Sequence, residues 1–225
     1  MIVPVLTIDG PSGSGKGTIA RKVAIALDWH LLDSGALYRL VGFASAKKGV
    51  STEIPGELAE LARHMTVRFG SDDSGNEQIW LDGEEVSAHI RTEKAGERAS
   101  VVASIPAVRE ALLEFQRGFR KAPGLVADGR DMGTQVFADA ELKVFLTASA
   151  EERAKRRHKQ LKDKGIDVSL AALSRDIEDR DRRDSQRTVA PLKPAEDAHL
   201  IDSSDMSIDD VTELVMSWAR KTWEM

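Results

Sequence analysis

GPSGSGKGT, residues 10–18, follows the apolar run VPVLTI of residues 3–8 and opens a helical pattern at Lys16. This order is that of a strand, a glycine-rich turn and a helix start. Glycines let successive backbone N–H groups point into one concavity that suits an anionic phosphate. The helix N-terminus adds partial positive charge there, and Lys16 adds a full charge that reaches the outer phosphates. The stretch therefore predicts a site for a nucleoside triphosphate.

The motif G-x-x-x-x-G-K is met by Gly10, Gly15 and Lys16, in the strand–turn–helix context that it requires. The next residue is Gly17, where the common form has a hydroxyl, and Thr18 comes one position later. We therefore expect no direct bond between a threonine and Mg²⁺. A glycine-rich surface loop is the competing interpretation, and it does not explain the strand and helix on either side. The residues expected to bind the triphosphate are Gly10, Pro11, Ser12, Gly13, Ser14, Gly15, Lys16, Gly17 and Thr18.

Composition narrows the class of protein. The chain has 225 residues, of which 41% are hydrophobic and 31% charged, as is ordinary for a soluble globular protein of one or two domains. Its net charge of −5 argues against nucleic-acid binding as the main role. The absence of cysteine excludes disulfides, zinc–cysteine sites and a thiol nucleophile. No leader and no membrane-spanning run of about 20 apolar residues is seen, so we expect a cytoplasmic protein without a membrane partner.

Apolar runs bounded by turn residues predict the strands of a buried parallel sheet. Helical patterns lie between these runs, and strands alternating with helices indicate a three-layer α/β fold. The predicted strands are Val5–Ile8, Trp29–Leu32, Leu125–Ala127, Leu142–Leu146 and His199–Ile201. The predicted helices are Lys16–Leu27, Ala36–Lys47, Ile105–Lys121, Glu151–Lys164, Leu170–Ser185 and Ile208–Lys221.

One segment breaks the alternation. Met65–Phe69 and Gln78–Leu81 alternate with period two, with turn residues at Ser71–Asn76 and at Asp82-Gly83. Residues 65–90 are therefore predicted to form a small antiparallel insertion.

Polar clusters follow three of the predicted strands, where functional groups of such folds collect. Asp9 precedes the phosphate loop (residues 10–18), and DSGALYR, residues 33–39, follows the second strand. The alternative interpretation of Asp33 or Ser34 is that its side chain only caps the following helix. Arg39, a few residues into that helix, is placed to turn back towards a phosphate. DGRDMGT, residues 128–134, follows the third strand, and Asp128 has the position of a carboxylate that orders Mg²⁺ and its waters. An acidic–basic loop paired with itself is the alternative here.

A basic stretch covers Glu151–Arg187, with 12 Lys and Arg against 9 Asp and Glu, a net charge of 12 − 9 = +3. The rest of the chain carries −5 − 3 = −8. Most of these charges are expected on a solvated helical face. Two arginine-bearing helices joined at Lys164-Gly165 are nevertheless suited to closing over phosphates, because the guanidinium fork donates two hydrogen bonds to phosphate oxygens.

Other classes fail on residue types. The only asparagine is Asn76, so the Asn-Lys-x-Asp motif of guanine recognition is missing, and so is a protein-kinase catalytic loop. The five histidines have no metal-ligand spacing.

Four segments together resemble the bacterial cytidylate kinases, a family of nucleoside monophosphate kinases. They are residues 8–18, residues 32–39, residues 127–134, and Asp184-x-x-Arg187 with VAPL of residues 189–192. The similarity spans nearly the whole chain, and Gly17-Thr18 after the lysine is the form that this family uses. The resemblance implies transfer of the γ-phosphoryl group of ATP to CMP or dCMP, with Mg²⁺ as the cofactor.

The resemblance also implies three parts. They are a core with a five-stranded parallel sheet (residues 1–34, 122–152 and 188–225), a monophosphate-binding domain (35–121) and a helical lid (153–187). The residues that it assigns to the CMP site are Ser34, Tyr38, Arg39, Ser100, Arg109, Arg130, Asp131, Asp184 and Arg187.

Catalysis is then expected from Lys16, Arg130 and the lid arginines Arg153, Arg157 and Arg180, with Mg²⁺ ordered through water by Asp128 or Asp9. The family resemblance suggests a monomer. Two rivals stay open: the acceptor is UMP or another monophosphate, or the chain is an ATP-binding regulatory module without transfer activity.

Overall fold

The computed structural model describes residues 2–71, 77–163 and 165–224. It divides into two compact units: a first unit of Met1–Asp33 with Arg117–Met225, and a second unit of Ser34–Gln116. Whether residues 153–187 form a separate lid stays a prediction.

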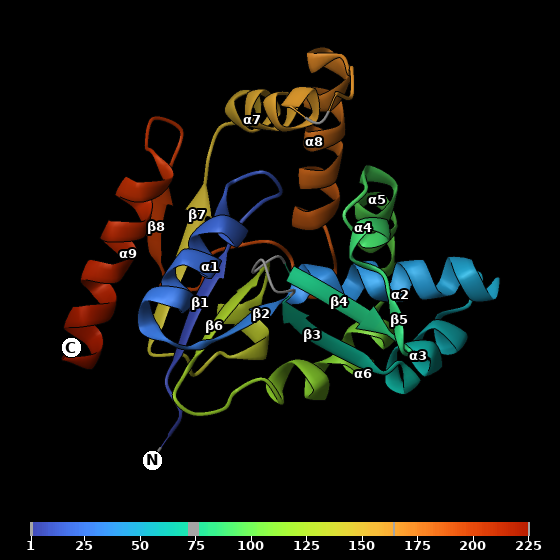
Figure 1. Cartoon of the computed structure of the whole chain (residues 1–225), viewed down its shortest axis with the longest axis horizontal. Helices are drawn as coiled ribbons and strands as arrows, with labels where there is room; N and C mark the ends of the chain where they lie inside the picture. Colours follow the sequence, from blue (N-terminus) through green and yellow to red (C-terminus); the bar gives the residue numbers. More distant parts are fainter. Residues whose placement is uncertain (1, 72–76, 164, 225) are drawn as a thin grey trace. The chain divides into compact units, whose positions relative to one another are not determined.

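The first unit is built on a parallel sheet in the order β2-β6-β1-β7-β8 (Figure 1). The predicted α/β fold and its five-stranded sheet are confirmed: each predicted strand is present and ends one or two residues later than predicted, and β2 also begins one residue later, at His30. The strands are β1 (Val5–Asp9), β2 (His30–Asp33), β6 (Leu125–Gly129), β7 (Leu142–Thr147) and β8 (His199–Asp202).

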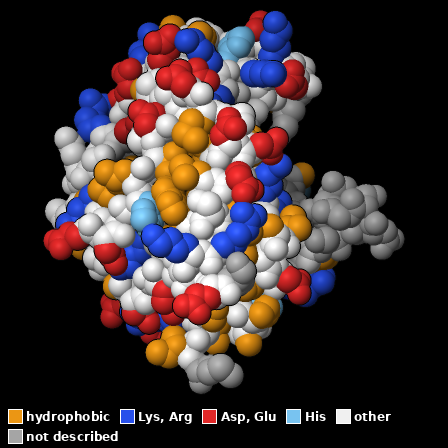
Figure 2. Space-filling model, turned by 90° about the vertical axis from the view of Figure 1, so that its left-hand side faces the viewer, with side chains coloured by type: hydrophobic (Ala, Val, Ile, Leu, Met, Phe, Trp, Pro, Cys, Tyr) orange, Lys and Arg blue, Asp and Glu red, His pale blue; other side chains and the backbone are white. Residues whose placement is uncertain are grey.

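Two helices pack on this sheet and on each other: α1 (Lys16–Leu27) and α9 (Ile208–Trp223). Their apolar residues join those of the strands in one core, to which Ile19, Val23 and Val215 contribute. A capping box fixes the start of α9, since Ser207 and Asp210 each accept from the other's backbone N–H. Figure 2 views the side of α9 and β8, where acidic and basic side chains are interspersed with hydrophobic ones.

The basic stretch forms α7 (Ala150–Asp163) and α8 (Leu170–Ser185), which pack against each other. A small apolar cluster joins them, made of Ala154, Leu161, Leu173 and Ile177. The two helices thus have a core of their own. The rest of their surface is largely charged, as the sequence predicts.

The second unit combines helices with the antiparallel insertion, a three-stranded sheet in the order β3-β4-β5. The third, two-residue strand was not predicted, and residues 72–76 of the expected turn lie outside the described residues. The elements are α2 (Ser34–Lys48), α3 (Pro55–His64), β3 (Val67–Ser71), β4 (Glu77–Leu81), β5 (Glu84–Glu85), α4 (Ser87–Ile90), α5 (Glu93–Val102) and α6 (Pro106–Arg117).

Three helices of this unit, α3, α4 and α5, have no counterpart among the predicted helices, and α6 ends at Arg117 rather than at Lys121. In the first unit, residues Met132–Val136 form a π-helix, η1, which was not predicted either. Within the described part of the chain, no helix is both long and apolar enough to cross a membrane.

Candidate active site

The sheet register brings the predicted polar clusters to one edge. Asp128 of β6 lies opposite Asp33 of β2 on one side and opposite Ile8 of β1 on the other. Asp9, one residue further along β1, is opposite Gly129. Because these strands are parallel, their carboxyl ends and the phosphate loop after β1 meet at the same edge.

Two glycines of the phosphate loop are required by their surroundings. A Cβ on Gly10, whose φ is +155°, would lie 2.0 Å from the carbonyl oxygen of Leu146 on β7. A Cβ on Gly13, at φ +78°, would lie 3.2 Å from the Cβ of Arg153 on α7. The loop is therefore pressed against β7 and α7. Its following helix has no side-chain cap at Gly15, which leaves the first-turn amides of α1 facing the loop.

Lys16 is buried at the base of this loop, where its Nζ donates to the carbonyl oxygen of Pro11 at 3.1 Å. Burial, with the positive charges of Arg130 and Arg180, lowers the pKa of Lys16 to about 7 against the opposing effect of Asp128 and Asp33. Three cations thus converge where a negative charge would relieve their repulsion. This is the electrostatic character of a phosphate site.

Asp184 of α8 holds two of the predicted arginines. It accepts from Arg130 Nε at 3.1 Å and from Arg187 Nη2 at 2.8 Å, and all three side chains are largely buried. Burial raises the pKa of the Asp184 carboxyl, but the charges of Arg130, Arg187 and Arg180 outweigh it, so the pKa lies below its ordinary value. The carboxylate therefore orients both guanidinium groups.

Both carboxylate oxygens of Asp9 are engaged by backbone N–H groups. Its two carboxylate oxygens accept from the backbone N–H groups of Met132 (2.9 Å) and Gly133 (2.8 Å), in the first turn of η1. Burial raises the pKa of Asp9 to about 7, although these two hydrogen bonds pull it down. Asp131, the residue before η1, is buried as well. Asp9 thus fixes the segment that carries Arg130 and Asp131.

The position of Asp128 explains why glycine stands at residue 17, where the common motif has a hydroxyl side chain. A Cβ at this position would lie 3.1 Å from Oδ2 of Asp128. The Asp128 carboxylate therefore stands where the side chain after the lysine would be. Thr18, with its backbone N–H bonded to the Gly15 carbonyl at 3.1 Å, continues the helix.

The three arginines that were predicted to act from a lid have different surroundings. Arg153 is buried, and its guanidinium donates to Ala148, Ser12 and Asp181. Arg157 is half-buried, donates to Gln160 at 3.1 Å, and has its pKa lowered by burial. Arg180 lies close enough to Lys16 and Asp184 to shift the pKa of both.

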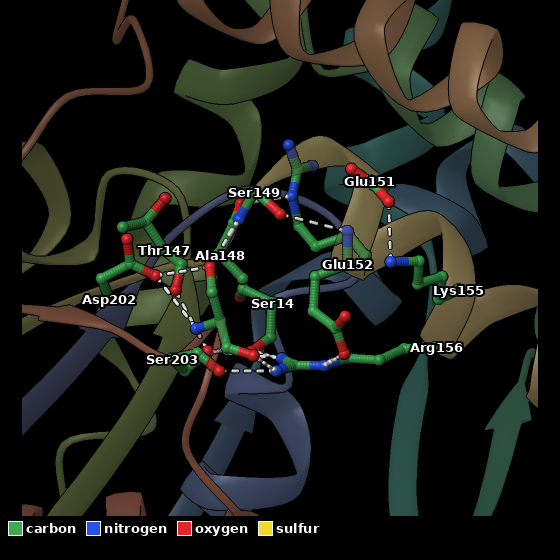
Figure 3. A network of polar contacts seen from close by, with 12 residues as sticks. Ser14, Thr147, Ala148, Ser149, Glu151, Glu152, Lys155, Arg156, Asp202 and Ser203 are labelled. Atoms are coloured by element: carbon green, nitrogen blue, oxygen red, sulfur yellow. Dashed lines mark hydrogen bonds and ion pairs between the residues drawn. The ribbon is translucent and has the colours of Figure 1, made fainter.

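A second link to the phosphate loop comes from Arg156, which is not among the predicted site residues. Figure 3 shows its guanidinium reaching from α7 towards Ser203 and Ser14, with Glu152 beside it. It donates to the carbonyl oxygens of Ser203 and Ser14 (2.5 and 3.5 Å). Ser203 Oγ in turn donates to the Thr147 carbonyl at 3.0 Å. Arg156 thus joins α7, the end of β8 and the loop.

The remaining predicted residues belong to the second unit. Arg39 of α2 donates to the carbonyl oxygens of Ile90 (2.7 Å) and Thr92 (3.1 Å), between α4 and α5. Arg109 of α6 donates to Ala103 at 3.1 Å, and its guanidinium lies 5.5 Å from the centre of the Tyr38 ring. Ser34 on α2 and Ser100 on α5 are buried. The structure thus brings Tyr38 and Arg109 together within this unit.

Besides Arg156, sequence reasoning missed two members of these networks, Asp181 and Ser203. Asp181 lies 28 residues from Arg153, and Ser203 lies 47 residues from Arg156. No local pattern joins residues so far apart. A site with a phosphate loop, a buried lysine and oriented arginines, on a parallel α/β sheet, is that of a nucleotide-dependent phosphotransferase.

Comparisons with known proteins specify the family. The family model described as cytidylate kinase matches residues 6–221. The cytidylate kinase of Pseudomonas paraeruginosa (strain DSM 24068 / PA7) is 61% identical over 215 residues, covering 95% of this chain and 94% of that protein. The cytidylate kinase of Cupriavidus pinatubonensis is 58% identical over 217 residues, covering 96% of each. The chain therefore belongs to the cytidylate kinase family.

Among solved structures, a gluconokinase from Sinorhizobium meliloti 1021 overlays with a TM-score of 0.48 at 14% identity, covering 99% of this chain and 95% of that one. This likeness is too distant to bear on function.

Proposed function

We propose that this protein transfers the γ-phosphoryl group of ATP to CMP or dCMP, forming ADP and CDP or dCDP. The observation that carries the proposal is the convergence of Lys16, Arg130 and Arg180 on the phosphate loop, with Asp184 holding two arginines. Membership of the cytidylate kinase family supplies the acceptor.

The donor is held by the phosphate loop. Its N–H groups and the N-terminus of α1 bind the β- and γ-phosphates, and Lys16 neutralises their outer oxygens. Burial and cationic neighbours lower the pKa of Lys16 to about 7. A bound phosphate raises this pKa again, so Lys16 carries its positive charge when the donor is bound. Arg130, Arg157 and Arg180 stabilise charge on the transferring group. Arg153 donates to protein acceptors instead.

Mg²⁺ fits the donor set near the loop. Among the described residues no cluster of three or more His, Cys, Asp or Glu side chains forms a metal cage. This suits Mg²⁺, which keeps several waters and uses one or two carboxylates plus substrate phosphates. Asp128, beside Gly17, is the carboxylate placed to hold it through water. When bound, the ion neutralises phosphate charge, while Asp9, bonded to η1, contributes by fixing the loop that follows β6.

The acceptor is held by arginines and by residues that read the base. Arg39 and Arg130, with Arg109, bind the phosphate of CMP, and Asp184 with Arg187 lies at the sugar. Ser100, Arg109 and Asp131 read cytosine, with Ser34 and Tyr38 completing the site. This assignment rests on the family motifs and on the burial of Ser34, Ser100, Arg109, Asp131 and Asp184.

No general base is needed, because a phosphate monoester with a second pKa of about 6 is already largely dianionic near neutral pH. Catalysis then rests on in-line positioning and on charge neutralisation. Closure of the lid, residues 153–187, over the phosphates excludes water, which would otherwise accept the phosphoryl group. The protein acts as a monomer.

The test is identification of the product. Wild-type protein is incubated with ATP, Mg²⁺ and CMP, and the nucleotides are separated by anion exchange. Equal amounts of CDP and ADP are expected, with ADP formation near background when CMP is omitted. ATP consumption without CDP, at the same rate with and without CMP, would contradict transfer and favour an ATP-binding module.

A further inference from the structure

Arg153 connects three segments that are distant in sequence. Its Nε donates to the carbonyl oxygen of Ala148 at 2.9 Å, before α7, and its Nη1 donates to the carbonyl oxygen of Ser12 at 3.0 Å, in the phosphate loop. The other edge of the guanidinium forms a two-pronged ion pair with Asp181 of α8, through Nη1 and Nη2. The side chain of Arg153 is only 5% exposed.

The stem of this arginine also shapes the loop. The ideal Cβ position on Gly13 is 3.2 Å from the Arg153 Cβ and 3.6 Å from its Cγ. The backbone of the phosphate loop therefore packs directly on Arg153, while the neighbouring Ser12 carbonyl accepts its hydrogen bond. A shift of the arginine would therefore disturb the loop backbone at Ser12 and Gly13.

Asp181 is the residue that holds Arg153 in place. The two carbonyl oxygens each accept a single N–H of the guanidinium, whereas a carboxylate adds a pair of parallel, charge-assisted N–H···O bonds that fixes the plane of the fork. Asp181 has side-chain exposure of 26% and is the one carboxylate bonded to this arginine among the described residues.

The next turn of α8 is anchored independently. Asp184 bonds Arg130 and Arg187, and its carbonyl oxygen accepts from the Leu192 N–H at 2.8 Å. Loss of Asp181 therefore releases the arginine at the phosphate loop, and leaves the Asp184 side of the helix tied to the chain.

We propose that Asp181 is a positioning residue for the donor nucleotide: it locks the Arg153 fork onto the Ser12 carbonyl and so sets the shape of the phosphate loop. The inference rests on the proposed function for its kinetic readout. It gives Arg153 a structural task at the loop, in place of direct contact with the transferring group.

The two roles of Arg153 predict opposite effects of the same substitution. If Asp181 positions the loop through Arg153, Asp181→Asn weakens donor binding, because an amide cannot accept from both prongs of the fork. We expect the KM for ATP and the equilibrium Kd for Mg²⁺–ATP to rise about tenfold, the effect of losing one charge-assisted hydrogen bond. The KM for CMP should stay within about twofold, since Asp184 keeps its own anchors.

If Arg153 instead acts as a charge on the transferring group, Asp181 competes for it. Asp181→Asn then leaves the KM for ATP unchanged or raises kcat, and either result would overturn the proposal. An equal rise of both KM values would also overturn it, because that is the signature of a general loss of structure. Thermal unfolding of each variant shows that it is folded.

Two further variants sharpen the test. Asp181→Glu keeps the carboxylate and should recover most of the ATP affinity. Arg153→Lys keeps the charge but not the fork, so it should lose ATP affinity about as much as Asp181→Asn, and the double variant should be no worse than either. Wild-type affinity in Arg153→Lys would contradict a role for the fork.

The matched control is Asp179→Asn, the same chemical change on the same helix. Asp179 forms an ion pair with Arg182 on the exposed side of α8. The kcat and KM values of the Asp179→Asn variant should therefore equal those of wild type. The Mg²⁺–ATP titration is made without an acceptor. A wild-type protein that fails to phosphorylate CMP refutes the proposed function, whereas unchanged ATP affinity in Asp181→Asn refutes the positioning role.

Discussion

Replacing Lys16 by methionine should stabilise the protein while it removes activity. Lys16 is buried beside Arg130 and Arg180, and its pKa lies near 7 instead of the ordinary 10.5. At pH 7 the folded state therefore carries the charge at a penalty. Because the pKa falls from 10.5 to about 7, this penalty is on the order of 4 kcal/mol at most, at about 1.36 kcal/mol per pH unit.

Methionine keeps most of the aliphatic stem, so this penalty is removed with little loss of packing. At about 2–4 °C per kcal/mol for a chain of this size, a gain of about 2–4 kcal/mol corresponds to a rise in Tm of roughly 4–16 °C at pH 7. The kcat should fall about 10²- to 10³-fold, as when one donor to a transition-state charge is removed.

The pH dependence gives a second check on the same reasoning. The unfolded chain binds a proton at Lys16 up to about pH 10 and the folded chain only up to about pH 7, so wild-type stability from this group rises between pH 7 and 10. The advantage of Lys16→Met should shrink over that range. Differential scanning calorimetry of both proteins without nucleotide measures it. A variant with unchanged or lower Tm at pH 7 would refute the account of the cationic cluster.

Three other substitutions have defined outcomes. Gly10→Ala should destabilise the protein by about 3 kcal/mol, because the new Cβ would lie 2.0 Å from the Leu146 carbonyl oxygen. Gly15→Ala has no atom within 4 Å of the new Cβ and should cost only the backbone strain of a positive φ. Chemical denaturation measures the free energy of unfolding of both variants. Asp184→Ala should lower the free energy of unfolding by about 3–5 kcal/mol, because Arg130 and Arg187 lose their shared carboxylate. The variant should also discriminate less between CMP and dCMP. An unchanged ratio of the kcat/KM values for CMP and dCMP would count against a contact of Asp184 with the ribose. The stability of wild type relative to Asp9→Asn should fall by about 2–3 kcal/mol from pH 5 to 7 and then level off, because the carboxyl ionises near pH 3.8 in the unfolded chain but only near pH 7 in the folded one; a difference in Tm that does not change with pH would contradict it.

The central sheet could be predicted from the sequence because its strands are continuous apolar runs. β1, β6 and β7 are buried almost throughout; apart from the buried Thr7 and Lys143, their polar residues come near the carboxyl ends. Helix α1 was predicted with its observed bounds, since the phosphate loop marks its start. The strand-end clusters followed from the geometry of parallel sheets.

The second unit was less predictable, because its helices depend on packing. In α5, the small residues Ala95, Gly96 and Ala99 are buried against α2, where Gly42 comes close to Arg98. A glycine and several charges hide the helical period of this segment. The short strand β5 has only two residues and exists through its pairing with β4.

The site residues that sequence could not supply are those fixed by long-range contacts. The π-helix η1 depends on the Asp9 carboxylate, 123 residues away from Met132. The bond between Arg153 and Ser12 spans 141 residues. The motifs indicate which residue types bind phosphate. Only the fold shows which arginines donate to protein acceptors, as Arg153 does.

The identity of the acceptor is the most direct test of the account. Initial rates of ADP formation would be measured with ATP and Mg²⁺ and with CMP, dCMP, UMP or AMP supplied separately. The account predicts high kcat/KM for CMP and dCMP and much lower values for UMP and AMP. A higher kcat/KM for UMP or AMP than for CMP would contradict it and would reassign Ser100, Arg109 and Asp131 as readers of another base.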